Sequence, residues 1–91
     1  MTPDIPLLAP EDWQERARLL QPLHGGPDVL VLLNPWDKLS ALLFAGLPGC
    51  QALATTSAGI AAALGYSDGE RAPLDELLAG VRRIVAGVDV P

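Results

Sequence analysis

The residues best suited to chemistry lie in two polar loops, each of which follows an apolar segment. In one loop, Ala52-Leu-Ala leads into small hydroxylated residues and a glycine. Hydroxyl groups and free backbone N–H groups at the start of a short helix can bind an anion such as a carboxylate. Beginning just after Thr55, this loop supplies the candidate substrate-binding residues Thr56, Ser57, Ala58 and Gly59.

The other loop, together with a later turn, adds two carboxylates and an aromatic side chain. Asp37 follows Trp36 at the end of a loop that comes after the apolar run 29–33. A carboxylate repels an anionic substrate unless a cation lies between them, so Asp37 is a candidate for organising the water around a metal ion. Trp36 could wall the same pocket. Asp68 lies in the turn sequence Ser-Asp-Gly and could approach that pocket as well.

Each candidate also has a purely structural explanation. Asp37 could be the N-cap of a helix, which stabilises it by about 1 kcal/mol, and Ser57 could be another such cap. Asp68 followed by glycine is typical of a simple turn. Trp36 could fill part of the core. The residue pattern alone leaves both interpretations open for all four positions.

The elements that must position these residues alternate between helix and strand. A helix is predicted over 10–23, because Pro10, Glu11 and Asp12 suit a first turn and Gly25 follows its end. Asp37 is predicted to open a second helix, with its apolar residues on the buried side: Leu39, Leu42, Leu43 and Phe44. A short helix over 58–64 and a long one over 73–87 complete the helical part.

Two strands are predicted between these helices, over 29–33 and 51–55. Their apolar residues do not alternate with polar ones, which is typical of parallel strands that are covered on both faces. Parallel neighbours place their carboxyl ends on one rim, where α/β folds build their sites. Cys50 precedes the second strand at the opposite end, so a nucleophilic role is not expected for it.

Four segments together resemble the isocitrate lyase/phosphoenolpyruvate mutase family over about residues 23–91. They read Asn34-Pro-Trp-Asp37, Thr55-Thr-Ser-Ala-Gly59, Leu64-Gly-Tyr-Ser-Asp-Gly-Glu70 and Leu74-Asp-Glu-Leu-Leu78. The resemblance implies that Asp37 lies near a metal and that the Ser57 loop contacts a small oxo- or hydroxy-carboxylate. Many members have a bulkier aromatic residue and more glycines in this second segment, so the exact substrate stays open, as does the choice between lyase, mutase and hydrolase.

The resemblance also implies a fold and a cofactor. The fold is α/β, the first two βα units of a TIM (β/α)₈ barrel, and a complete barrel needs about 250 residues. We divide the chain into a leader over 1–9 and a partial barrel domain over 10–91. Mg²⁺ would be bound by an Asp-x-Glu pattern on a third strand, and a Lys-x-Cys loop would supply a catalytic acid or base; the 91 residues contain neither that strand nor that loop. The chain is therefore expected to be inactive alone.

The amino-acid composition excludes several classes of function. The chain carries a net charge of −5 and its six basic residues are scattered, which disfavours nucleic-acid binding. No apolar run reaches the roughly 18 residues that could span a bilayer, so no membrane role is expected. A single cysteine excludes an internal disulfide framework and suits the cytoplasm. The alternative to an enzyme fragment is a non-catalytic module that self-associates through exposed strand edges, or a decayed gene copy.

Overall fold

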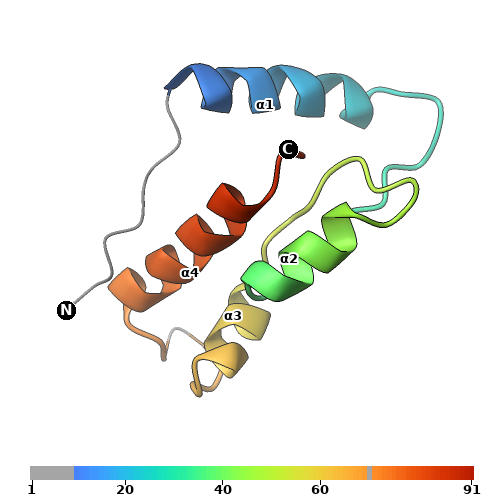
Figure 1. Ribbon diagram of the computed structural model, residues 1–91. Helices are drawn as coiled ribbons and strands as arrows, with labels where there is room; N and C mark the ends of the chain where they lie inside the picture. Colours follow the sequence, from blue (N-terminus) through green and yellow to red (C-terminus); the bar gives the residue numbers. More distant parts are fainter. Residues whose placement is uncertain (1–9, 70) are drawn as a thin grey trace.

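The computed structural model describes residues 10–69 and 71–91, and four helices follow one another along this part of the chain (Figure 1). They are α1 (Pro10–His24), α2 (Lys38–Ala45), α3 (Ser57–Ala63) and α4 (Leu74–Gly87). The predicted helices are therefore present, with ends within one or two residues of those expected. The predicted leader over 1–9 lies outside the described residues.

The two predicted strands form only one bridge among the described residues. Leu33 pairs with Leu53, and the pairing is parallel as expected. The backbone N–H of Ala54 donates to the carbonyl of Leu33 at 3.1 Å. The prediction of regular strands over 29–33 and 51–55 is wrong, because each segment takes part in one isolated bridge only. A two-stranded sheet is marginal without further neighbours, because each strand then has an open edge.

A third extended segment lies on the other side of the second one. The N–H of Leu53 donates to the carbonyl of Pro91 at 2.9 Å, whereas the next N–H, that of Ala54, points to Leu33. Successive N–H groups of an extended chain point to opposite sides. The segment around Leu53 therefore lies between residues near Leu33 and residues near Pro91, which is the order expected for consecutive strands of a barrel.

Helix α4 is the centre of the packing. Both α2 and α3 pack against it, and the buried apolar cluster consists of Ala41, Ile60, Ile84 and Val88. The Lys38 side chain lies over Gly87, where a Cβ atom would sit 3.2 Å from Lys38 Cγ. Glycine at this position lets α2 and α4 approach closely.

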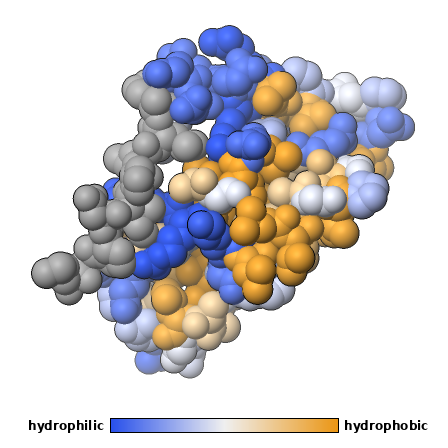
Figure 2. All heavy atoms as spheres, viewed as in Figure 1, coloured by the Kyte–Doolittle hydropathy of each residue, from blue (hydrophilic) through white to orange (hydrophobic). Residues whose placement is uncertain are grey.

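Of the apolar residues expected on the buried side of α2, the three leucines are instead exposed and Phe44 is half-buried. Leu39, Leu42 and Leu43 have exposed fractions of 65%, 46% and 62%, while the buried residues of α2 are Ser40 and Ala41. Hydrophobic residues gather over this helix on the face shown in Figure 2. The small residues of α2 turn toward α4, and nothing among the described residues covers the leucines.

Helix α1 crosses the end of the molecule where the carboxyl end of α4 lies (Figure 1). The Arg16 guanidinium donates to the carbonyl oxygens of Val85, at 3.0 Å, and Val88. These carbonyls belong to the last turn of α4 and its C-cap, where a cation is favourable. Among the described residues, no helix combines the length and the apolar character needed to cross a bilayer.

Candidate functional site

The two polar loops meet where the first two extended segments end. The side-chain amide of Asn34 donates to the carbonyl of Ala54 at 2.8 Å, one residue beyond the Leu33–Leu53 bridge. This hydrogen bond ties the two segments together at their carboxyl ends. The parallel bridge therefore puts the Asp37 loop and the Ser57 loop on the same rim, as the sequence predicted.

Asp37 is the N-cap of α2. Its Oδ1 accepts a hydrogen bond from the Ser40 N–H at 2.8 Å, and Ser40 Oγ accepts from the N–H groups of Asp37 and Trp36 at 3.1 and 3.0 Å. This reciprocal arrangement is a capping box. The structural explanation offered for Asp37 is thus confirmed, and one carboxylate oxygen is committed to it.

Thr56, not Ser57, is the N-cap of α3. The Thr56 hydroxyl accepts from the Gly59 N–H at 3.2 Å, and the helix begins at Ser57. The interpretation of Ser57 as a simple cap is therefore wrong. The capping role falls one residue earlier because Thr56 has the extended backbone of an N-cap, with φ −123° and ψ 116°.

Gly59 of the second loop lies close both to Thr56 of its own loop and to Trp36 of the first loop. A Cβ atom built there would lie 2.6 Å from Thr56 Cγ2 and 3.2 Å from Trp36 Cβ. Only glycine fits this gap without movement of a neighbour. Trp36 and Gly59, both predicted site residues, are thus brought together.

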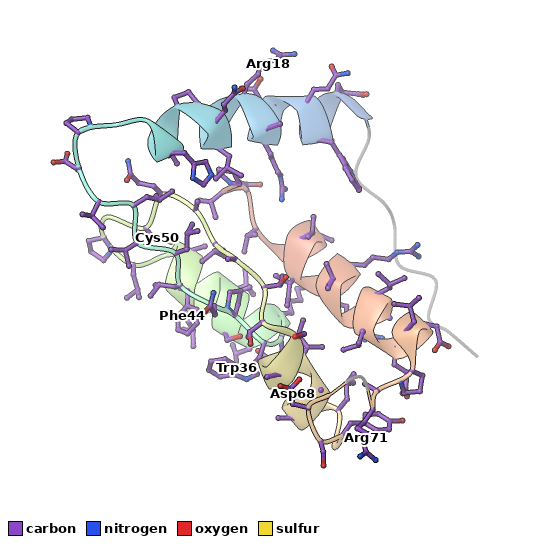
Figure 3. All side chains as sticks on the ribbon, turned by 180° about the vertical axis from the view of Figure 1, so that it is seen from behind. Arg18, Trp36, Phe44, Cys50, Asp68 and Arg71 are labelled. Carbon is purple, nitrogen blue, oxygen red and sulfur yellow. The ribbon has the colours of Figure 1, made fainter. Side chains whose placement is uncertain are left out.

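Trp36 is partly exposed and packs edge-on against Phe44 of α2. Their ring centroids are 5.7 Å apart, with an interplanar angle of 74°, and Trp36 is 44% exposed (Figure 3). This geometry is favourable for an aromatic pair. The Trp36 side chain is therefore not buried in the core; it packs on Phe44 and lies half-exposed beside the two loops.

The remaining predicted residues are exposed. Ser57 and Ala58 are exposed in the first turn of α3, and Asp68 is exposed in a turn completed by Gly69, whose φ is +95°. The turn interpretation of Asp68 is thus confirmed, while no contact joins it to Asp37 or Ser57. In Figure 3, Asp68 is drawn beside α3, and Cys50 lies well away from Trp36, toward the other end of the extended segments.

One titratable pair links the turn after α3 to the start of α4. A hydrogen bond with Glu76 raises the pKa of Tyr66 above 10.0, and partial burial and the negative charges of Glu76 and Asp75 act in the same direction. Glu76 Oε2 is buried without a hydrogen-bond partner among the described residues. This pair lies close in sequence to Asp68 and joins the turn after α3 to the first turn of α4.

An open apolar cavity of about 650 Å³ lies elsewhere, between α1 and α4. Thr55 lines it, so the threonine side chain faces the helices and not the rim loop. Its apolar lining includes Trp13, Leu20, Leu53, Leu78 and Val85, and the guanidinium groups of Arg16 and Arg82 add positive charge. We call it the α4 groove.

The described residues do not assemble a metal site. Across 10–69 and 71–91 no three His, Cys, Asp or Glu side chains cluster as metal ligands would. The nearest candidate, Asp37, uses Oδ1 for the capping box. The residues present therefore do not fit Mg²⁺ without ligands from elsewhere.

Sequence reasoning gave no role to two residues that organise the site. Asn34 joins the two loops, and Ser40 completes the capping box. Asn34 carried a usable signal, because an asparagine directly after an apolar run has a side-chain amide that can bridge to a neighbouring strand. Ser40 stands three residues after Asp37, the spacing of a capping box.

A comparison with protein families completes this picture. The family model of phosphoenolpyruvate phosphomutase matches residues 19–91, which cover the whole candidate site. The chain belongs to the phosphoenolpyruvate phosphomutase family. No curated protein and no solved structure matches the chain.

The family explains the order of the elements. Phosphoenolpyruvate phosphomutase domains have the TIM-barrel fold, and the described residues form a fragment of such a domain with four helices and a single parallel bridge. In such barrels the loops at the carboxyl ends of the strands form the active site. Asp37 and Ser57 lie on the rim at this end of the two extended segments.

Proposed function

We propose that this chain forms part of the substrate cradle of a magnesium-dependent enzyme that makes or cleaves a C–C or P–C bond beside a carboxylate, through an enolate. The observation that carries the proposal is the parallel Leu33–Leu53 bridge, which puts two loops of a phosphoenolpyruvate phosphomutase domain on one rim. The substrate class is small oxo- or hydroxy-carboxylates.

The proposed binding donors are those that the helix cap leaves free. Because the Gly59 N–H is held by Thr56, the donors for a substrate carboxylate are the Ser57 hydroxyl and the N–H groups of Ser57 and Ala58. The described residues offer these groups no acceptor, and both residues are exposed. Fixed donors of this kind stabilise negative charge as it develops on an enolate.

In the proposed enzyme, none of the described residues binds magnesium directly. Its direct ligands would come from residues other than those described, since these form no cluster of ligands. Asp37 would orient water around the ion through the carboxylate oxygen that the capping box does not use. The 91-residue polypeptide by itself is therefore proposed to bind a carboxylate without turning it over.

Binding of oxalate, a planar mimic of an enolate, tests the cradle. In an NMR titration of the 91-residue protein, we expect amide shifts centred on Ser57 and Ala58. Ser57→Ala should weaken binding about tenfold or more, because a hydrogen bond to a charged group is lost. Thr55→Ala is the matched control, since its side chain lines the α4 groove. Equal effects of both substitutions would contradict the proposal.

Two substitutions separate the proposed role of Asp37 near magnesium from its role as a helix cap. Asparagine caps a helix about as well as aspartate, so Asp37→Asn should leave the melting temperature unchanged, whereas Asp37→Ala should cost about 1 kcal/mol. In a complete family enzyme that shares the Asn-Pro-Trp-Asp sequence, the asparagine variant should lose magnesium-dependent turnover. Unchanged turnover would leave Asp37 with the cap alone.

A further inference from the structure

We propose that Asn34 and Pro35 act together as positioning residues for the substrate cradle: Pro35 ends the hydrogen-bond ladder between the first two extended segments, and the Asn34 side chain supplies the donor that Pro35 lacks. The inference rests on the proposed function, because the cradle that it positions is the set of donors at Ser57 and Ala58. Asn34 and Pro35 do not touch the substrate. They act through the spacing of the two loops.

The backbone ladder between the two segments ends at Pro35. The Ala54 N–H donates to the Leu33 carbonyl at 3.1 Å. In a parallel pair, the carbonyl of the same residue then accepts from the N–H two residues farther along the neighbouring segment, which here is position 35. Proline has no N–H group. The ladder therefore provides no backbone donor for the Ala54 carbonyl at its next step.

The side chain of Asn34 takes this place. Its amide nitrogen lies 2.8 Å from the Ala54 carbonyl oxygen, which is a normal length for an N–H···O hydrogen bond. The pairing thus continues for one more step through a side chain instead of the backbone. Because the side chain makes this bond, the backbone after Asn34 can leave the neighbouring segment and enter the first loop.

Pro35 fixes the direction in which the chain leaves. It is fully buried, and its ring holds φ at about −65°. Proline also disfavours helical backbone in the residue before it, so Asn34 stays outside α2, which begins at Lys38. The next residue, Trp36, donates its N–H to Ser40 Oγ at 3.0 Å. The chain is therefore held by hydrogen bonds on both sides of a buried proline.

The two loops are joined at two places as a result. The Asn34–Ala54 hydrogen bond joins them where the segments end, and Trp36 lies beside Gly59, where a Cβ atom would sit 3.2 Å from Trp36 Cβ. The cradle donors lie between Ala54 and Gly59 in the sequence. Binding groups work well only when their spacing is fixed. Loss of the Asn34 bond would let these donors move relative to Asp37 on the other loop.

A cycle of two substitutions tests this arrangement. Asn34→Ala removes the side-chain donor, and Pro35→Ala restores a backbone N–H that can donate to the Ala54 carbonyl. In oxalate titrations of the 91-residue protein, Asn34→Ala should weaken binding about fivefold, which corresponds to the loss of one ordinary hydrogen bond. In the Pro35→Ala background, the same substitution should change the affinity by no more than about twofold. A bond that only stabilises the fold would lower the melting temperature without changing the affinity.

The positions of the loops can also be measured without a ligand. We expect the NMR amide shifts of Ser57 and Ala58 to differ between Asn34→Ala and the unmodified protein. The same shifts should agree between the double variant and Pro35→Ala alone, because the backbone N–H replaces the lost donor. If the unmodified protein binds no oxalate, the proposed function fails, and these two amide shifts still decide the positioning role.

Gln51→Ala is the matched control, because Gln51 is an exposed polar residue at the other end of the same segment. It should leave the oxalate affinity and the two amide shifts unchanged. Four results would each overturn the proposal: unchanged amide shifts in Asn34→Ala, unchanged affinity of that variant for oxalate that the unmodified protein binds, no rescue by Pro35→Ala, or an equal effect of Gln51→Ala. Circular dichroism should show the same helix content throughout; a loss of helix in Asn34→Ala would mean that the bond supports the fold and not the cradle.

Discussion

At the scale of single residues, Gly59 leaves room for the Thr56 cap of its own helix and for Trp36 of the other loop. Gly59→Ala should destabilise the protein by about 1–3 kcal/mol, because its Cβ would overlap Thr56 Cγ2 at 2.6 Å. Helix propensity alone would favour alanine over glycine by up to about 1 kcal/mol, so a lower stability of the variant would have to come from the steric overlap. Thermal unfolding measures it. Gly25→Ala is the control, since nothing lies within 4 Å of its Cβ; equal melting temperatures would contradict the close approach.

Tyr66 reports on the loop that carries Asp68. Its pKa lies above 10.0, chiefly because of the hydrogen bond with Glu76. A raised pKa in the folded state means that this contact contributes stability below pH 10, which is lost as the pH rises through the folded pKa. Tyr66 is the only tyrosine in the chain, so absorbance near 295 nm titrates it directly.

The carboxylate of Glu76 is the partner to remove. Glu76→Gln should lower the midpoint of the Tyr66 titration toward 10.0, because the variant removes the negative charge that disfavours the phenolate. Asp75→Asn is the matched control, with a smaller expected change, since Asp75 is the last and weakest cause of the shift. A midpoint that is the same in all three proteins would show that Tyr66 and Glu76 are not in contact.

At the scale of elements, Arg16 holds α1 to the end of α4. Arg16→Ala should cost about 1.5–3 kcal/mol, because two charge-assisted hydrogen bonds to the Val85 and Val88 carbonyls are lost. The fluorescence of Trp13, which lines the α4 groove, should shift to longer wavelength as α1 detaches; Trp36→Phe removes the other tryptophan signal.

A second arginine on the same helix provides the comparison. Arg18 pairs with Glu15 at 3.5 Å, with both side chains more than half exposed, and Figure 3 shows it on the outer side of α1. Exposed pairs of this kind contribute little. Arg18→Ala should therefore leave both the stability and the Trp13 emission nearly unchanged. An equal effect of the two substitutions would mean that Arg16 does not dock α1.

At the scale of the whole molecule, the order of the extended segments can be measured by amide exchange. The N–H of Leu53 is bonded to Pro91, and that of Ala54 to Leu33. Removing residues 90 and 91 should speed exchange at Leu53 by about tenfold or more, as an opened hydrogen bond loses its protection. Ala54 should keep its rate. If both amides respond alike, the two bonds do not belong to opposite sides of the segment.

The sequence determined the helices and the parallel direction of the two extended segments. Acidic first turns, the Asp37 cap and the glycines after α1 and α2 are local signals, so the ends of the helices could be predicted to within a residue or two. Apolar runs followed by polar loops, together with the family motifs, were enough to place Asp37 and Ser57 on one rim. These features depend on residues that are close together in the sequence, so they can be read from it.

Only the tertiary structure decided which surfaces are covered and which residue performs each task. The leucines of α2 satisfy a helical pattern, yet Ala41 faces α4, because the close α2–α4 contact admits small side chains only. Thr56 is the cap that the structural alternative had given to Ser57. Asn34 joins the loops, which depends on where the second segment lies beside the first. Apolar runs alone could not show whether regular strands form. A strand needs hydrogen bonds to neighbouring strands, and the described residues provide a single bridge.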